Sequence, residues 1–153
     1  MVIADTDFLS SFVKIEKTNL ILKAFDTNMI IIASAVLHEL EDAPFFDSIL
    51  HLIASNVIKV KSIDVRASED LGAGEMESIA LAAQTRDILL MSDRSALRYA
   101  EQRSIVVFDI PTFLFYCKKK KILLKKDIQE IMRELIQKDY YEFSDDVTKA
   151  LLE

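Results

Sequence analysis

Short apolar runs alternate along the chain with longer segments whose apolar residues recur at helical spacing. Five of the short runs are rich in Val, Ile and Leu and apolar at nearly every position, which is typical of strands buried on both faces of a sheet. We therefore predict strands over residues 2–4, 29–33, 57–60, 88–91 and 105–108. The segments between them carry apolar residues three and four positions apart, the spacing of an amphipathic helix.

The order of these elements predicts the architecture. Strands and helices alternate as β-α-α-β-α-α-β-α-β-α-β, which is typical of an α/β fold in which helices cover both faces of a parallel sheet. Beyond Pro111 the pattern predicts an aromatic helix, a helix over about residues 127–138, and a short last helix with Ser144 as its N-cap. We therefore expect one three-layer α/β/α domain over residues 1–153, with a core over 1–121 and a helical extension over 122–153.

The composition limits the functions that need considering. A chain of 153 residues is long enough for one domain with its own core. Its formal net charge of −6 weighs against binding nucleic acid over the whole surface, so a nucleic-acid substrate would need local contacts. The apolar runs are shorter than the roughly 20 residues that span a bilayer, and the first residues lack the features of a signal peptide. We expect a cytoplasmic protein with no membrane partner.

Acidic residues follow three of the predicted strands. Asp5 comes directly after the first strand, Glu39 lies on the helix after the second, and Asp93 follows the fourth. Because ligands of parallel sheets bind at the carboxyl ends of the strands, we expect these side chains at one edge. Carboxylates gathered there repel one another unless a cation neutralises them, and Mg²⁺ or Mn²⁺ prefers such oxygen ligands. The sequence therefore predicts a divalent metal site.

Two further glutamates open the helix that follows the only two glycines of the chain. Gly72 and Gly74 stand immediately before Glu75, where we interpret them as permitting a tight turn into the helix. Glu75 and Glu77 are two positions apart and point about 200° apart on a helix, so they cannot both face one metal ion. We expect one of the two to face solvent.

Each of these carboxylates also has a purely structural interpretation, because Asp and Glu cap helices and suit the helix dipole. Asp7 is the clearest case, since it can cap a helix beginning at Phe8 as easily as it can hold a metal through water. We therefore rank it below Asp5 as a ligand. His38 and His51 have no second histidine at ligand spacing, which argues against zinc. Hydrolysis at carboxylate-bound metal ions needs no histidine.

Residues 74–82, which read GEMESIALA, resemble the signature helix of the prokaryotic VapC-like proteins of the PIN domain family. Three more blocks are similar to that group in order and spacing: VIADTD at 2–7, IIIASAVLHEL at 30–40 and LLMSDRSALRYA at 89–100. The closing helical segments are similar as well. The resemblance covers nearly the whole chain and implies a PIN-like fold with two extra C-terminal helices.

The resemblance also implies a site and an activity. The implied ligands of Mg²⁺ or Mn²⁺ are Asp5, Glu39, Asp93 and either Glu75 or Glu77. Ser34 and Ser92 would add hydroxyl groups behind these ligands. The implied activity is hydrolysis of RNA by a metal-activated water, often by the toxin of a toxin–antitoxin pair and often in a homodimer.

Two positions depart from the pattern of that group. Ser92 stands beside Asp93 where a second aspartate is frequent, and Asp109 stands where a glycine is usual. Each lost carboxylate lowers the affinity for a cation, so a second metal would be held weakly. A PIN fold that has lost catalysis and acts as a binding module is therefore an alternative.

The sequence also leaves a phosphatase and an interaction module open. Asp5 and Asp7 resemble the opening motif of haloacid-dehalogenase-type phosphatases, in which the first Asp is the nucleophile and the second the acid and base. That interpretation leaves Glu39 unexplained. A non-catalytic interaction module would instead use the acidic edge as a solvated surface and the closing helices as a partner-binding face.

Basic residues are the weakest of the candidates. Arg94 and Arg98 lie four positions apart just beyond Asp93, where they could contact phosphate or pair with a carboxylate of the site. The four lysines at 118–121 could attract an RNA backbone. A lysine run at a helix end more often suits the helix dipole, which is the interpretation we favour.

Overall fold

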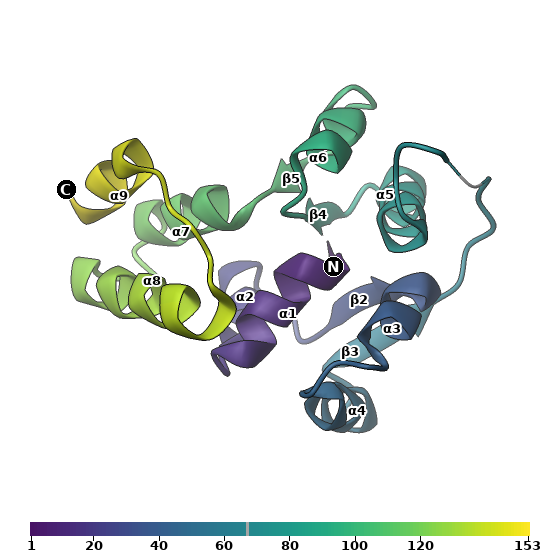
Figure 1. Ribbon diagram of the computed structural model, residues 1–153, viewed down its shortest axis with the longest axis horizontal. Helices are drawn as coiled ribbons and strands as arrows, with labels where there is room; N and C mark the ends of the chain where they lie inside the picture. Colours follow the sequence, from purple (N-terminus) through teal and green to yellow (C-terminus); the bar gives the residue numbers. More distant parts are fainter. Residues whose placement is uncertain (67) are drawn as a thin grey trace.

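A five-stranded parallel sheet forms the centre of the computed structural model, which describes residues 1–66 and 68–153 (Figure 1). The strands lie in the order β3-β2-β1-β4-β5, and every pairing is parallel. Their bounds are β1 Val2–Ala4, β2 Ile30–Ala33, β3 Ile58–Lys61, β4 Ile88–Leu90 and β5 Val107–Phe108. The prediction of five strands in an α/β fold is confirmed, with each strand within two residues of its expected bounds.

Helices connect the strands in the order that the sequence predicts. They are α1 Thr6–Lys14, α2 Thr18–Ala24, α3 Ser34–Leu40, α4 Phe46–Ala54, α5 Ala73–Thr85, α6 Arg94–Glu101, α7 Ile110–Lys119, α8 Lys125–Asp139 and α9 Asp145–Leu152. Ser144 accepts a hydrogen bond from the Val147 amide at 3.2 Å, so it caps α9 as expected. In the described part of the chain, no helix is long and apolar enough to cross a bilayer.

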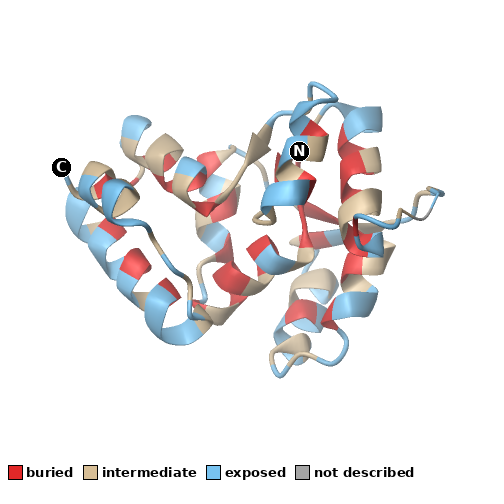
Figure 2. Ribbon diagram, turned by 45° about the horizontal axis from the view of Figure 1, so that its top comes forward, coloured by how far each residue is buried: buried red, intermediate tan, exposed pale blue. Residues whose placement is uncertain are grey.

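The core lies along the central strand β1 and its neighbour β2. Every residue of β1 and β2 is fully buried, which explains why these runs are apolar at each position rather than at every second one. Figure 2 shows the same pattern in the helices, whose buried residues face inward while exposed residues cover the outside. Burial on both faces is the physical basis of the strand prediction.

Three phenylalanine rings fix α1 against α7. The ring centroids of Phe8 and Phe12 lie 5.1 Å apart, and that of Phe113 lies 5.7 and 5.3 Å from them in edge-to-face contacts. All three side chains are fully buried. Aromatic pairs of this kind stabilise by roughly 0.5–1.5 kcal/mol beyond their buried area, so α1 is held firmly where it leaves the end of β1.

The closing helices are tied to the rest of the domain by charged side chains. Asp139, the last residue of α8, accepts hydrogen bonds from Ser11 and from Lys14, the latter at 2.8 Å. Lys118 donates to the carbonyl groups of Ala150, Leu151 and Glu153 at 3.0–3.2 Å, so it caps the end of α9. This contact supports the structural interpretation of the lysine run. The division of the domain at residue 121 stays a prediction.

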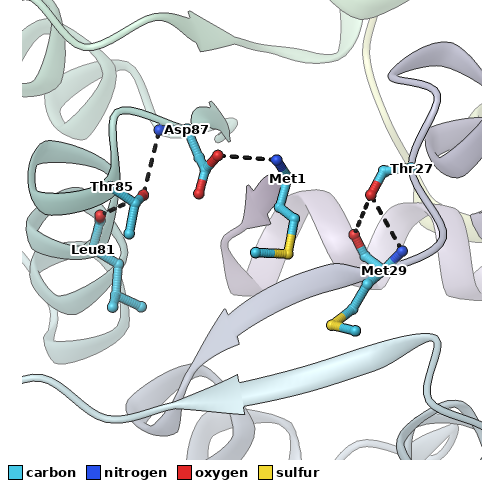
Figure 3. A network of polar contacts seen from close by, with 6 residues as sticks. All are labelled: Met1, Thr27, Met29, Leu81, Thr85 and Asp87. Atoms are coloured by element: carbon cyan, nitrogen blue, oxygen red, sulfur yellow. Dashed lines mark hydrogen bonds and ion pairs between the residues drawn. The ribbon is translucent and has the colours of Figure 1, made fainter.

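Polar contacts also order the amino ends of the strands, opposite the carboxyl edge of the sheet. The terminal amino group of Met1 lies 3.0 Å from the Asp87 carboxylate, and the hydroxyl of Thr85, the last residue of α5, donates to the Leu81 carbonyl and accepts from the Asp87 amide (Figure 3). Thr27 donates to the Met29 carbonyl at 3.3 Å just before β2.

Candidate functional site

Asp5 is the buried centre of the acidic edge. It follows β1 directly, and its side chain is 2% exposed. Its carboxylate accepts a hydrogen bond from the Phe8 amide at 2.9 Å, so Asp5 is the N-cap of α1. Burial raises the pKa of Asp5 from 3.8 to about 8, and the charges of Asp7 and Glu75 add to this effect, although backbone hydrogen bonds at Phe8 and Ser92 oppose it. A carboxyl group so placed favours a bound proton or cation.

The cap of α1 corrects one expectation about Asp7. The helix begins at Thr6 rather than Phe8, because Asp5 and not Asp7 caps it. Asp7 lies in the first turn instead. Its pKa is raised, first by partial desolvation and then by the charges of Glu39, Asp93 and Asp139, while Lys14 lowers it. Asp7 therefore belongs to the same electrostatic cluster as the stronger candidates.

Glu39 reaches the edge from α3 and is held between two other elements. One of its carboxylate oxygens accepts from the hydroxyl of Thr6, and the other accepts from the amide of Gly74 at 3.1 Å. A Cβ atom added to Gly74 would lie 2.7 Å from both oxygens. The absence of a side chain at residue 74 is thus what lets α5 approach Glu39.

This contact gives the glycines a different role from the one expected. Neither glycine has a positive φ, and Gly72 is extended with φ −69° and ψ 163°. The expectation of a special turn conformation was therefore wrong. The steric demand is at Gly74, whereas a Cβ atom on Gly72 would find ordinary contact with Glu75 at 3.9 Å.

Glu75 and Asp93 complete the cluster of acids. The carboxylate of Glu75 accepts from the Gly72 amide at 3.1 Å in the first turn of α5. Its pKa is raised, first by partial burial and then by the charges of Asp93, Asp7 and Glu39, against the effect of the Gly72 hydrogen bond. Asp93 follows β4 and caps α6 by accepting from the Ala96 amide at 2.9 Å. Five carboxylates from four parts of the chain thus form one cluster, in which neighbouring negative charges raise the pKa of Asp5, Asp7 and Glu75.

Glu77 lies apart from that cluster. Its carboxylate accepts from the Ala35 amide at 2.8 Å and from the Ser34 hydroxyl at 3.2 Å, at the N-terminal end of α3. The separation from Glu75 follows from the helix geometry, but the expectation that one of the pair faces solvent was wrong. Glu77 is half-buried and joins α5 to α3. Ser34 accordingly supports Glu77 and makes no hydrogen bond to Glu39 or the other acids of the cluster among the described residues.

Other candidates border the acidic edge. The hydroxyl of Ser92 is buried and has no hydrogen-bond partner among the residues that the structure describes. Asp109 accepts from the Thr112 amide at 2.9 Å and caps α7. Arg94 lies near Tyr141, whose pKa is raised to about 12 by burial and by the charges of Asp109 and Asp139, while Arg94 lowers it. Arg94 and Arg98 are both exposed.

The chemistry of this donor set fits a divalent metal ion. Asp5, Asp7, Glu39, Glu75 and Asp93 supply hard oxygen atoms, and their mutual repulsion would be relieved by Mg²⁺ or Mn²⁺. Over residues 1–66 and 68–153, no three His, Cys, Asp or Glu side chains are grouped closely enough to form a finished ligand set. Binding would therefore require these side chains to draw together. His38 is not part of this donor set, since it is exposed and its Nδ1 lies 3.4 Å from a carboxylate oxygen of Glu41.

Sequence reasoning missed the partners that hold the acids in place. It did not identify Thr6 and Gly74 as hydrogen-bond donors to Glu39, or Asp139 as a neighbour of Asp7. Gly74 carried a signal, because a glycine just inside a helix needs a reason, but the sequence does not reveal which side chain approaches it. Asp139 carried none, because its position depends on how α8 packs on α1.

Comparison with known proteins identifies the fold. The family model described as "DUF3368: PIN domain" matches residues 1–153. Among solved structures, a PilT N-terminus domain protein from the hyperthermophilic archaeon Sulfolobus solfataricus P2 is similar with 14% identity and a TM-score of 0.54, covering 74% of this chain and 90% of the other. The structure of the PIN domain endonuclease Utp24 is similar with 13% identity and a TM-score of 0.52, covering 71% and 84%.

Comparison with curated protein sequences gives no match. The structural similarities concern the fold alone at these identities, whereas the family model spans the whole chain. Of the two families that the sequence resembles, the match decides for the PIN domain family over the haloacid-dehalogenase-type phosphatases. The chain belongs to the PIN domain family.

Proposed function

We propose that this protein is a metal-dependent endoribonuclease that acts in the cytoplasm and hydrolyses RNA phosphodiesters with Mg²⁺ or Mn²⁺. The observation that carries the proposal is the environment of Asp5, a buried carboxyl group next to other carboxylates, with a pKa raised to about 8. Such a group destabilises the fold when it is ionised without a counter-charge. A catalytic cation would supply that counter-charge and would explain why an aspartate is buried at residue 5.

Each acid has a proposed role. Asp5, Glu39 and Asp93 bind the metal, Glu75 completes the site, and Asp7 lies at its margin. When bound, the metal supplies an activated water and a positive charge that stabilises the leaving oxygen. The residues of the chain keep these acids in position, since the Phe8 and Ala96 amides hold Asp5 and Asp93.

The N-terminal ends of three helices also stabilise negative charge at the proposed site. The N-terminal ends of α1, α5 and α6 all lie at this edge, because Asp5, Glu75 and Asp93 occupy their first turns or caps. The positive end of a helix dipole favours both carboxylates and a phosphate group, by roughly 0.3–1 kcal/mol for each charge. We assign Arg94 and Arg98 to contacts with the RNA phosphates, because both are exposed on α6 just beyond Asp93.

The family relationship supports the same activity. Utp24, which has the same fold, is described as an endonuclease. We further propose that this chain acts as a homodimer and as the toxin of a toxin–antitoxin pair, on the similarity of residues 74–82 to VapC-like proteins. Sedimentation of the purified protein tests the dimer, and arrest of growth on expression, relieved by a co-expressed neighbouring protein, tests the toxin.

Cleavage of RNA by the purified protein tests the activity itself. A set of end-labelled single-stranded RNAs is incubated with Mn²⁺, Mg²⁺ or EDTA, beside the Asp93→Asn and Asp127→Asn variants. Asparagine can still cap α6, so Asp93→Asn removes the charge and keeps the fold. Asp127 caps the distant start of α8 at 2.8 Å from the Leu124 amide, and its variant controls for the loss of one negative charge.

The expected result is cleavage with either metal by the wild type and by Asp127→Asn, and none by Asp93→Asn or with EDTA. Cleavage by Asp93→Asn at the wild-type rate would contradict the role of Asp93. No cleavage by the wild type with either metal would favour the second candidate, a PIN fold that binds without catalysis. One observation favours this candidate: among the described residues, no three His, Cys, Asp or Glu side chains lie close enough together to form a ligand set.

A further inference from the structure

A groove leads away from the acidic edge along α1. It has a volume of about 730 Å³ and begins at Thr6, Asp7, Glu39 and Ser92. From there it follows α1 to Lys14. Figure 1 shows α1 between α8 on one side and α3 and α4 on the other, and the groove is lined from these two sides. A chain bound at the acidic edge can therefore continue into it.

Aromatic side chains line both sides of this groove. Phe45 precedes α4 on one side, and Tyr140 and Tyr141 follow α8 on the other. Tyr140 is 85% exposed, more than any other large apolar side chain in the described part of the chain. Its neighbour Tyr141 is half-buried and packs against Phe143 at a centroid distance of 4.7 Å.

The backbone that carries Tyr140 is anchored although its ring is free. Tyr140 ends α8 in the left-handed conformation with φ 54°, and the Tyr141 amide bonds to the Leu135 carbonyl at 3.1 Å. One residue earlier, Asp139 is tied to Lys14 of α1. An exposed ring on a fixed backbone can bind a flat partner with little loss of conformational freedom.

The charges of the groove indicate what kind of partner fits. Asp7, Glu39 and Asp139 are acidic, and Lys14 is already paired with Asp139, which leaves Lys138 as the exposed cation at this end. The groove is thus poorly suited to follow a phosphate backbone by charge. Stacking of a base on an aromatic ring contributes roughly 1–3 kcal/mol, and it requires bases that are not already stacked in a duplex.

We propose that this groove binds unpaired nucleotides beside the scissile phosphate, and that the ring of Tyr140 stacks on one of their bases. This inference rests on the proposed ribonuclease function and adds to it a substrate-binding residue, Tyr140, outside the acidic cluster. The Lys14–Asp139 ion pair holds the end of α8 beside α1, and it thereby holds Tyr140 close to the acidic edge.

Variants of Tyr140 separate stacking from folding. Tyr140→Asn removes the ring, and asparagine adopts the left-handed conformation more readily than tyrosine, so the variant should fold. Tyr140→Trp keeps a stacking surface. Leu124→Asn is the matched control, because Leu124 is 61% exposed at the opposite end of α8, outside the groove.

The first readout is the KM and kcat for cleavage of a single-stranded RNA of about ten nucleotides, a length within the site sizes of single-strand binders. Loss of one stacked base should raise KM by about 5- to 150-fold with kcat little changed. Tyr140→Trp and Leu124→Asn should retain a wild-type KM. An unchanged KM in Tyr140→Asn would overturn the inference, as would preference for the same RNA annealed as a duplex.

The second readout distinguishes failure of the inference from failure of the ribonuclease. The same RNA carrying 2-aminopurine is bound to Asp93→Asn protein with and without Tyr140→Asn. Stacking quenches this fluorophore, so quenching should occur only with the ring present. Quenching that depends on the Tyr140 ring, together with no cleavage of RNA by the wild type, would keep the groove assignment and refute the nuclease. Cleavage without any quenching dependent on Tyr140 would do the reverse.

Discussion

Substitution of Gly74 by alanine is the sharpest structural test of where Glu39 lies. The new Cβ atom would stand 2.7 Å from both carboxylate oxygens, and ordinary contact begins at 3.4 Å, so the carboxylate must withdraw by about 0.7 Å, the difference of these two distances. The hydrogen bond from the residue 74 amide, now 3.1 Å long, would then break. Glu39 would be left with the Thr6 hydroxyl alone.

The effects on stability and on the site should differ in size. Alanine in place of glycine in a helix stabilises by roughly 0.5–1 kcal/mol, and loss of one hydrogen bond to a charged but exposed carboxylate costs about as much. The free energy of unfolding should therefore change by less than about 1 kcal/mol. Groups that orient a metal ligand typically contribute about 10- to 100-fold to metal affinity or activity, so we expect a loss of that order.

Gly72→Ala is the matched control for this experiment. Its Cβ atom would lie 3.9 Å from the nearest Glu75 oxygen and its φ is −69°, so alanine fits without displacing an acid. Urea denaturation measures the stability of both variants, and Mn²⁺ titration with RNA cleavage measures the site. Equal metal affinity and equal cleavage in Gly74→Ala and Gly72→Ala would refute the placement of Glu39 at the functional edge.

Four further outcomes follow from the structure. Without metal, burial raises the pKa of Asp5 from 3.8 to about 8, so the folded chain keeps a proton that the unfolded chain has lost, and the free energy of unfolding should fall by up to about 1.4 kcal/mol per unit as pH rises through this window. Urea denaturation at several pH values should show that the free energy of unfolding depends less on pH in Asp5→Asn than in the wild type. An unchanged pH dependence would contradict the raised pKa of Asp5. Glu77→Gln should lower stability by about 1–2 kcal/mol in the same assay while Mn²⁺ affinity stays unchanged, because this carboxylate holds the start of α3. Asp139→Asn should cost about 1–3 kcal/mol, since it removes the partner of Lys14 between α8 and α1, and no loss would show that this tie is dispensable. Phe113→Ala should cost about 3–5 kcal/mol in thermal or urea unfolding, as the ring is fully buried against two others.

The sheet could be predicted from the sequence because its strands are uniformly apolar. Burial on both faces removes the alternation that an exposed sheet would show, and the runs that form β1 and β2 consequently stand out. The edge on which the acids lie follows from the same prediction, since parallel strands share one carboxyl edge. Asp5, Glu39 and Asp93 were therefore predictable as neighbours.

The finer features could not be predicted, because they depend on tertiary contacts. Either Asp5 or Asp7 could cap α1 by local rules, and the choice depends on where β1 ends. The reason for Gly74 is a side chain 35 residues away, which a local rule for glycine cannot supply. From the helix alone, one of Glu75 and Glu77 was expected to face solvent, whereas α3 packs against α5 and brings two donors to Glu77.

Binding of Mn²⁺ to the metal-stripped protein, followed by the electron paramagnetic resonance signal of the free ion, tests the central claim most directly. The wild type and Asp127→Asn should bind the ion with equal affinity. Asp93→Asn should bind it at least about tenfold more weakly, because one of the clustered carboxylates is lost. Equal binding by all three proteins, or no binding by the wild type, would contradict the assignment of the acidic edge as a metal site.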